Sequence, residues 1–204
     1  MSKNIEWNNV KDAAMKYFGQ VFLIVFSVVL GLYLSENIED KKNERDAQKL
    51  LAKINLELNS NKKLLDYWVP YHKEIIIKLD SLSSDKDFIN NFINDKSSIF
   101  IAFSRGTIMS DIPASDAWDI AKSHPLIVNI DYDKLLILSK IYNQQKFTYG
   151  SISVIFDFMI SPEFNSSDQA KQNLQLFRDK LNEVHGRELQ LLNYYKQMEK
   201  FQND

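Results

Sequence analysis

Residues 17–35 read YFGQVFLIVFSVVLGLYLS and contain no charged side chain. A helix of this length is about 28 Å long, close to the roughly 30 Å thickness of the hydrocarbon core of a bilayer. Lys16 and Glu36 bound the run, and Tyr17 and Tyr33 stand near its two ends, where interfacial aromatic residues are common. The stretch therefore predicts one transmembrane helix in contact with the lipid bilayer.

Two other interpretations of this stretch compete with a retained anchor. A soluble domain would have to bury the whole run inside a chain of only 204 residues. A cleaved signal peptide would need small residues two apart after the apolar run, whereas Gly31 and Ser35 lie four apart with Tyr33 between them. We expect the anchor to be retained.

Small residues recur every four positions within the run, at Ser27, Gly31 and Ser35. This spacing places them on one face of the helix, and such faces let transmembrane helices approach closely. We predict that this face packs against another membrane helix. A chance spacing is the alternative, because glycine and serine are common in membrane helices.

The overall composition is that of a folded protein, with 45% hydrophobic and 25% charged residues. Only 5 glycines and 4 prolines occur, which disfavours the many turns of β-sandwiches and barrels. A net charge of −2 gives no reason to expect a nucleic-acid partner. The absence of cysteine excludes disulfides, thiolate metal sites and cysteine nucleophiles.

Apolar residues that step alternately by three and four predict three long helices. The first seam contains Leu51, Ile54, Leu58, Asn61, Leu65 and Trp68, and it should end or kink at Val69–Pro70. The second runs through Leu135, Leu138, Tyr142, Gln145, Tyr149, Ile152, Phe156 and Met159. The third runs through Leu174, Phe177, Leu181, Val184, Glu188, Leu191, Tyr195 and Met198.

These patterns predict an all-α protein in which an N-terminal transmembrane helix continues into a long amphipathic helix within a bundle of about four to six helices. The expected order is a short polar leader at 1–16, the span at 17–35, a charged connector at 36–46 and a helical-bundle domain at 47–204.

Several local features leave alternatives or make narrower predictions. The connector reads ENIEDKKNERD and is expected to be helical, with a flexible linker as the alternative. Residues 97–103 fit either a helix or a short strand. Asp131 is a good N-cap, and Ser166 with Gln169 forms a capping-box pattern for the last helix.

The sequence contains no recognisable set of catalytic residues. We therefore predict no catalytic residue, no cofactor and no metal site, and a protein that is not an enzyme. The three histidines lie far apart in the sequence, and His185 and Glu188, three residues apart, are expected at the surface. Arg105 and Trp118 are the candidates for contact with a small ligand, whose identity the sequence leaves unknown.

Two runs of the chain resemble a known family. The run KYFGQVFLIVFSVVLGLYLSENIEDKKNERDAQKLLAKINLELNSNKKLL and the later run SDAWDIAKSHPLIVNIDYDKLLILSKIY are similar to the two shared blocks of a bacterial family of single-span membrane proteins with a domain of unknown function. His124–Pro125 stands where that family usually has glycine. The resemblance implies an N-terminal anchor and a helical C-terminal domain, and no activity.

The expected function is that of a membrane-anchored interaction or accessory protein that works through helix–helix contacts, either with itself as a homo-oligomer or with a membrane-protein partner. The alternative is an extracytoplasmic sensory module that binds a ligand and signals through a partner. The expected location is the bacterial inner membrane.

The sequence contains evidence for either location of the bundle, periplasmic or cytoplasmic. Lys11 and Lys16 lie close to the span, as in a signal anchor, and together with the resemblance they favour a periplasmic C-terminal domain. A plain count of Lys and Arg favours a cytoplasmic one.

Overall fold

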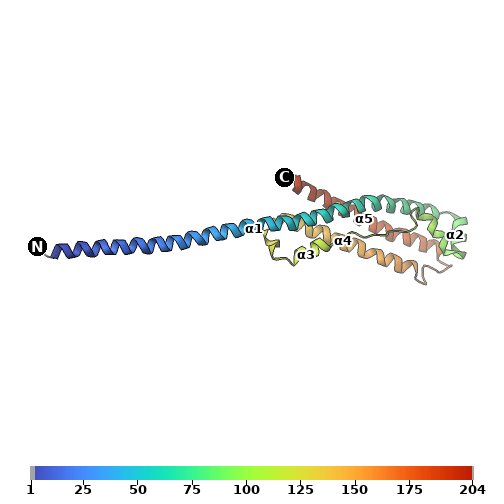
Figure 1. Cartoon of the computed structure of the whole chain (residues 1–204). Coiled ribbons are helices and arrows are strands. Elements are labelled where there is room, and N and C mark those ends of the chain that lie inside the picture. The colour runs from blue at the N-terminus through green and yellow to red at the C-terminus, as the bar shows by residue number, and fades with distance from the viewer. Residues whose placement is uncertain (1–2, 204) are drawn as a thin grey trace. The chain divides into compact units, whose positions relative to one another are not determined.

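The computed structural model describes residues 3–203, with side chains from 15 to 201. Contacts divide the chain into two units, Met1–Lys49 and Leu50–Asp204. The helices are α1 (Lys3–Leu82), α2 (Lys86–Asn94), the 3-10 helix η1 (Lys96–Ala102), α3 (Asp116–Lys122), the 3-10 helix η2 (Pro125–Asn129), α4 (Tyr132–Met159) and α5 (Ala170–Asn203) (Figure 1). The described residues contain no strand, so the predicted all-α class is confirmed.

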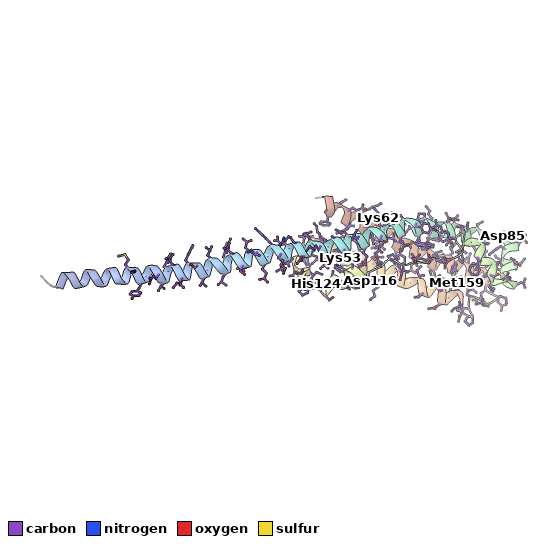
Figure 2. All side chains as sticks on the ribbon, in the orientation of Figure 1. Lys53, Lys62, Asp85, Asp116, His124 and Met159 are labelled. Carbon is purple, nitrogen blue, oxygen red and sulfur yellow. The ribbon has the colours of Figure 1, made fainter. Side chains whose placement is uncertain are left out.

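The first unit consists of the N-terminal part of α1. This is the one helix in the described part of the chain that is long and apolar enough to cross a membrane, judged by length and composition. Its most apolar window has a mean hydropathy of 2.1 and buries no residue, and Figure 2 shows its side chains projecting on several sides. The stretch is therefore not a core helix of this chain.

The charged connector, residues 36–46, is helical throughout, because α1 passes through it without a break. The flexible-linker alternative is therefore wrong. The contact boundary between the two units falls just after it, between Lys49 and Leu50. Lys3 and Lys11 of the predicted leader lie outside the described side chains.

The second unit is a helical bundle whose core lies along the predicted seams. The seam residues of α1 are all buried, namely Leu51, Ile54, Leu58, Leu65 and Trp68. α4 and α5 pack against each other along their length, and Figure 1 shows them side by side. Burial of this many large apolar side chains supplies the main favourable free energy of folding, at about 1.5–3 kcal/mol for each one fully buried.

The sequence predicted that the first amphipathic helix ends or kinks at Val69–Pro70. An end there is wrong, because α1 continues through Pro70 to Leu82, and a kink stays a prediction. Proline removes one backbone donor and leaves the carbonyl of Asp66 without its helical partner. Asp66 and Pro70 are both exposed, so water can satisfy that carbonyl. Buried Trp68 and Tyr71, on either side of Pro70, anchor the helix to the core.

The strand alternative for residues 97–103 is wrong, because η1 occupies this segment up to Ala102. Asp95 starts the 3-10 helix: its side chain accepts the Ser97 N–H at 2.9 Å, and its carbonyl accepts the Ser98 N–H at 3.2 Å. Ile99 faces the core.

The predicted helix starts have mixed outcomes. The Asp131 side chain accepts the Lys134 N–H at 3.0 Å, so this N-cap of α4 is confirmed. The capping box at Ser166 and Gln169 is wrong, because residues 167–169 form bends and turns and α5 begins only at Ala170. The Gln169 carbonyl accepts the Asn173 N–H at 2.8 Å, so Gln169 itself stands at the start of the helix rather than three residues inside it.

Candidate functional site

A long non-helical segment, residues 103–115, lies against the bundle between η1 and α3. It is partly buried, with Ile108 and Met109 in the core. Backbone groups of a buried loop need hydrogen-bond partners, because unpaired ones cost free energy comparable to a lost hydrogen bond. The polar residues of the helix seams supply those partners.

Asn61 of α1 pairs with the backbone of Ala114 in both directions. Its Nδ2 donates to the Ala114 carbonyl at 2.7 Å, and its Oδ1 accepts the Ala114 N–H at 2.8 Å. Gln145 of α4 donates to the same carbonyl at 2.8 Å and to the Pro113 carbonyl at 3.1 Å. The hydroxyl of Tyr195 on α5 donates to Gln145 Oε1 at 3.5 Å. All three long helices thus contribute to one polar layer.

His72 and Glu188 form the centre of a second polar layer, and both side chains are fully buried. His72 Nε2 lies 3.1 Å from the Ile108 carbonyl, which can only accept, so this nitrogen carries a proton. His72 Nδ1 lies 2.9 and 3.0 Å from the two Glu188 oxygens. A hydrogen bond at these distances needs one proton between Nδ1 and the carboxylate.

Two further side chains surround Glu188. The hydroxyl of Tyr149 on α4 donates to its Oε1 at 3.3 Å, and His185 Nδ1 lies 3.8 Å from its Oε2. Burial alone raises the pKa of the Glu188 carboxyl, but the imidazoles of His185 and His72 outweigh burial and hold that pKa below its usual value. Burial and the adjacent Glu188 raise the pKa of Tyr149, so this phenol remains protonated at neutral pH.

Glu57 of α1 fixes the start of α3. Its carboxylate accepts the Ala117 N–H at 2.8 Å and the hydroxyl of Tyr142 at 2.7 Å. Burial, reinforced by Glu57, raises the pKa of Tyr142. The Tyr142 ring in turn stacks on Trp118, with centroids 5.4 Å apart and planes 4° apart. α1, α3 and α4 are thereby joined at one point.

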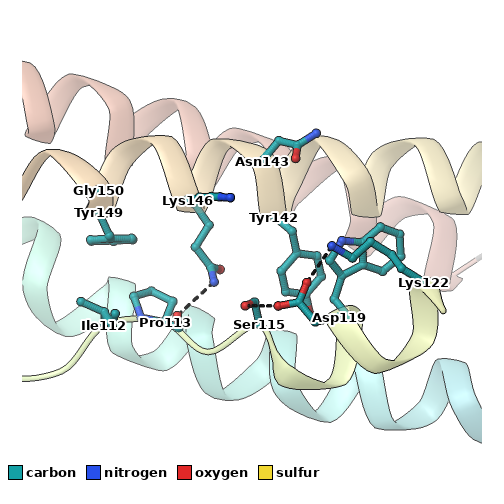
Figure 3. A pocket seen from close by; sticks show the side chains of 12 residues that line it. Ile112, Pro113, Ser115, Asp119, Lys122, Tyr142, Asn143, Lys146, Tyr149 and Gly150 are labelled. Carbon is teal, nitrogen blue, oxygen red and sulfur yellow. Dashed lines mark hydrogen bonds and ion pairs between the residues drawn. The ribbon is translucent and has the colours of Figure 1, made fainter.

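A cleft of about 450 Å³ lies beside these layers, between α3, the end of segment 103–115 and the middle of α4 (Figure 3). The lining residues are Ile112, Pro113, Ser115, Trp118, Asp119, Lys122, Tyr142, Asn143, Gln145, Lys146, Tyr149 and Gly150. The lining is polar and apolar in nearly equal parts, and the volume lies within the range of small-molecule sites.

The structure separates the two residues that the sequence singled out for ligand contact. Trp118 lines the cleft, whereas Arg105 is not among the lining residues. The Arg105 guanidinium lies over the rings of Tyr67 and Tyr71, at 3.8 and 4.6 Å, and donates to the Tyr67 carbonyl at 2.9 Å. Its contacts attach segment 103–115 to α1.

The predicted membrane contact face remains open within the chain. Nothing lies within 4 Å of a Cβ placed on Gly31, and Ser35 is exposed. The hydroxyl of Ser27 donates to the Leu23 carbonyl of its own helix at 2.7 Å, so it needs no partner on another helix. The face therefore offers three small residues, one of which, Ser27, already has its hydroxyl paired within its own helix.

The surface placement expected for Glu188 is wrong, because Glu188 is fully buried and pairs with His72. The signal was present in the sequence, since Glu188 lies on the third seam and His72 continues the first seam by a step of four after Trp68. Which seam positions face each other could not be inferred from one helix at a time. Within the described residues, no group of three or more His, Asp or Glu side chains is placed to hold a metal ion.

Comparison with family models, with curated proteins and with solved structures gives no match to this chain. Over the described residues, fold and site together define a class: an all-α protein with one exposed apolar helix and a helical bundle that holds the non-helical segment 103–115 through buried polar layers.

Proposed function

We propose that this chain is a single-span membrane protein whose helical bundle serves as an interaction or accessory subunit, without catalytic activity of its own. The observation that carries the proposal is the apolar part of α1, which is entirely exposed within the chain. Exposure of so much contiguous apolar surface to water is unfavourable, and a bilayer removes that cost. The buried pair of His72 and Glu188 has no exposed surface to offer a substrate.

Helix–helix contact within the membrane is the proposed mode of interaction, through the face of Ser27, Gly31 and Ser35. Oxidative crosslinking in native membranes tests it with Gly31→Cys, and Val29→Cys on the opposite face is the matched control. We expect a crosslinked product with Gly31→Cys and much less with Val29→Cys. Equal products, or none, would contradict this contact face.

Partners outside the membrane require a second experiment. Chemical crosslinking of the full chain in native membranes, followed by mass spectrometry, should recover crosslinks from the bundle either to a second copy or to a defined membrane protein. A chain that is strictly monomeric and recovers no specific crosslink would contradict the interaction function.

The proposed location is the bacterial inner membrane with the bundle in the periplasm, supported by the lysines near the span and by the family resemblance. The chain has no native cysteine, so Ser84→Cys, at an exposed position, reports the side of the membrane without background. We expect a membrane-impermeant maleimide to label it in intact cells. Labelling only after permeabilisation would place the bundle in the cytoplasm.

The cleft beside α3 favours a second candidate function, an extracytoplasmic sensory module that binds a ligand and signals through a partner. The carrying observation is its volume of about 450 Å³ with buried aromatic walls. Thermal-shift measurements on the full chain with panels of metabolites test this function. A dose-dependent shift supports it, and the absence of any shift counts against it.

A further inference from the structure

We propose that the cleft between α3 and α4 binds a small organic monoanion with an aromatic body, with its acidic group facing Lys146. This inference rests on the second proposed function and gives it a class of ligand. It is carried by three properties of the cleft: the charge balance of its lining, its aromatic walls, and the space left by Gly150 (Figure 3).

The lining carries one net positive charge. Asp119 and Lys122 form an ion pair at 2.7 Å, and the hydroxyl of Ser115 donates to the same carboxylate at 2.8 Å. Asp119 is thus already occupied and neutralises Lys122. Lys146, the other cation of the lining, makes no hydrogen bond or ion pair with the described residues and acts on Asp119 only by longer-range electrostatic attraction. The cleft therefore favours a ligand with a single negative charge.

The inner wall is aromatic and held in place. Trp118, Tyr142 and Tyr149 are all buried residues that contribute to the lining. The hydroxyl of Tyr142 is bonded to Glu57, and that of Tyr149 to Glu188. A wall fixed by such bonds loses little conformational freedom on binding, so aromatic contacts contribute to affinity rather than to ordering the site.

The inner polar groups of the cleft are already satisfied, which limits the polarity of the ligand. The Gln145 side chain donates to the Pro113 and Ala114 carbonyls and accepts from Tyr195. A ligand rich in hydroxyl groups would find few free partners at this depth. An apolar ring there, with its charge toward the exposed Lys146, satisfies both ends of the site.

Gly150 leaves the cleft open on the α4 side. No atom lies within 4 Å of a Cβ placed on this residue, although it stands inside a long helix where glycine is unfavourable. A larger side chain at this position can therefore be accommodated without a clash and would occupy part of the cleft. Replacing Gly150 by a larger residue should therefore block the site, and it should also stabilise the helix.

The test uses benzoate as the probe and benzamide as its neutral match, titrated into the full chain in detergent by calorimetry. An ion pair at a largely exposed lysine contributes modestly, so we expect benzoate to bind about fivefold more tightly than benzamide. Lys146→Gln should remove this preference while leaving benzamide binding unchanged. Lys140→Gln, an exposed lysine of α4 outside the cleft, should retain the preference.

Gly150→Leu should abolish binding of both probes while the helical circular dichroism of the chain is retained. Equal binding of benzoate and benzamide to the native chain would overturn the ligand class but leave a ligand-binding function standing. If neither probe binds, the inference is also overturned. The thermal-shift measurements with the metabolite panel then test the ligand-binding function on their own. Unchanged benzoate binding by Gly150→Leu would place the probe elsewhere and overturn the inference.

Discussion

The buried pair of His72 and Glu188 permits a quantitative test, because its two partners should be strongly coupled and their single substitutions should be unequally destabilising. Both side chains have no exposed surface, and each Glu188 oxygen lies within 3.0 Å of His72 Nδ1. The perturbation is a double-mutant cycle of His72→Leu, Glu188→Leu and the double variant. The quantity measured is the free energy of unfolding of the bundle.

The two single variants leave different groups without partners. His72→Leu removes the imidazole nearest to a buried carboxylate, and breaking a buried ion pair in this way costs about 3–5 kcal/mol. Glu188→Leu leaves a histidine that can be neutral and still donate from Nε2 to the Ile108 carbonyl. The Nδ1 acceptor and the Tyr149 hydroxyl then lose their partner, at a cost of about 1–3 kcal/mol.

The double variant should be about 1–3 kcal/mol less stable than the native chain. It should therefore be more stable than His72→Leu alone. It removes the buried charge altogether and leaves unpaired only neutral groups, the Ile108 carbonyl and the Tyr149 hydroxyl. The coupling energy then amounts to about 4 kcal/mol, well above the roughly 0.5 kcal/mol within which independent sites add.

These values are measured by urea unfolding of the full chain in mild detergent. Tryptophan fluorescence monitors the unfolding, in a chain that also carries Trp7→Phe. Trp68 and Trp118, the remaining reporters, are both buried in the second unit. The surface pair of Lys78 and Glu74, at 2.8 Å with side chains 39% and 45% exposed, provides the control cycle. Its coupling should stay below about 1 kcal/mol. Additive effects at His72 and Glu188 would refute the reasoning.

Three further predictions concern Glu188, Asn61 and Pro70. The pKa of Glu188 is below its usual 4.5 in the folded chain, so its ionised form stabilises the bundle above that pH. This contribution should be lost as the pH falls through the lower folded value. Glu188→Gln should lack this part of the acid destabilisation in urea unfolding measured at a series of pH values, and an unchanged pH profile would contradict it. Asn61→Ala leaves the Ala114 N–H without its partner and should cost about 2 kcal/mol in the same assay, whereas exposed Asn59→Ala should cost less than about 0.5 kcal/mol; equal losses would argue against the pairing. Pro70→Ala supplies the N–H that α1 lacks and should raise the melting temperature by circular dichroism, with a gain of about 1–2 kcal/mol after the higher entropy of the unfolded chain is subtracted. A lower melting temperature would show that proline fits this turn better than alanine.

The long helices could be predicted from the sequence because their determinants are local. Steps of three and four place Leu58 and Leu65 on one face of α1, and both are buried. The extended segment 103–115 could not be predicted in the same way, because its backbone is held by side chains distant in the sequence. Asn61 and its partner Ala114 are separated by 53 positions. No local sequence pattern predicts that pairing.

The same distinction explains which parts of the candidate site were found. Trp118 was identifiable as a large aromatic residue on a short helix, and it lines the cleft. Glu188 was recognised as a seam residue, yet its partner His72 lies 116 positions away on another helix. A polar residue at a seam position indicates that a buried partner exists. It does not indicate which residue that partner is.

The polar layers have a consequence for specificity that an apolar bundle would lack. Apolar seams tolerate sliding of one helix along another, whereas a buried polar group is satisfied in only one register. Asn61 and Gln145 fix the end of segment 103–115 at Ala114, next to Ser115 in the cleft lining. The cleft wall is thus positioned by the same residues that set the helix register.

This arrangement separates residues that shape the cleft from residues that only recognise a ligand. Asn61→Ala should reduce both the stability of the bundle and the binding of benzoate, because the wall near Ala114 loses its attachment. Lys146→Gln should change the charge preference alone, because Lys146 is exposed and makes no ion pair or hydrogen bond with the described residues. If Asn61→Ala lowers stability and leaves binding of the probe intact, the polar layers serve helix register only. If both fall together, the buried layers are part of the binding site.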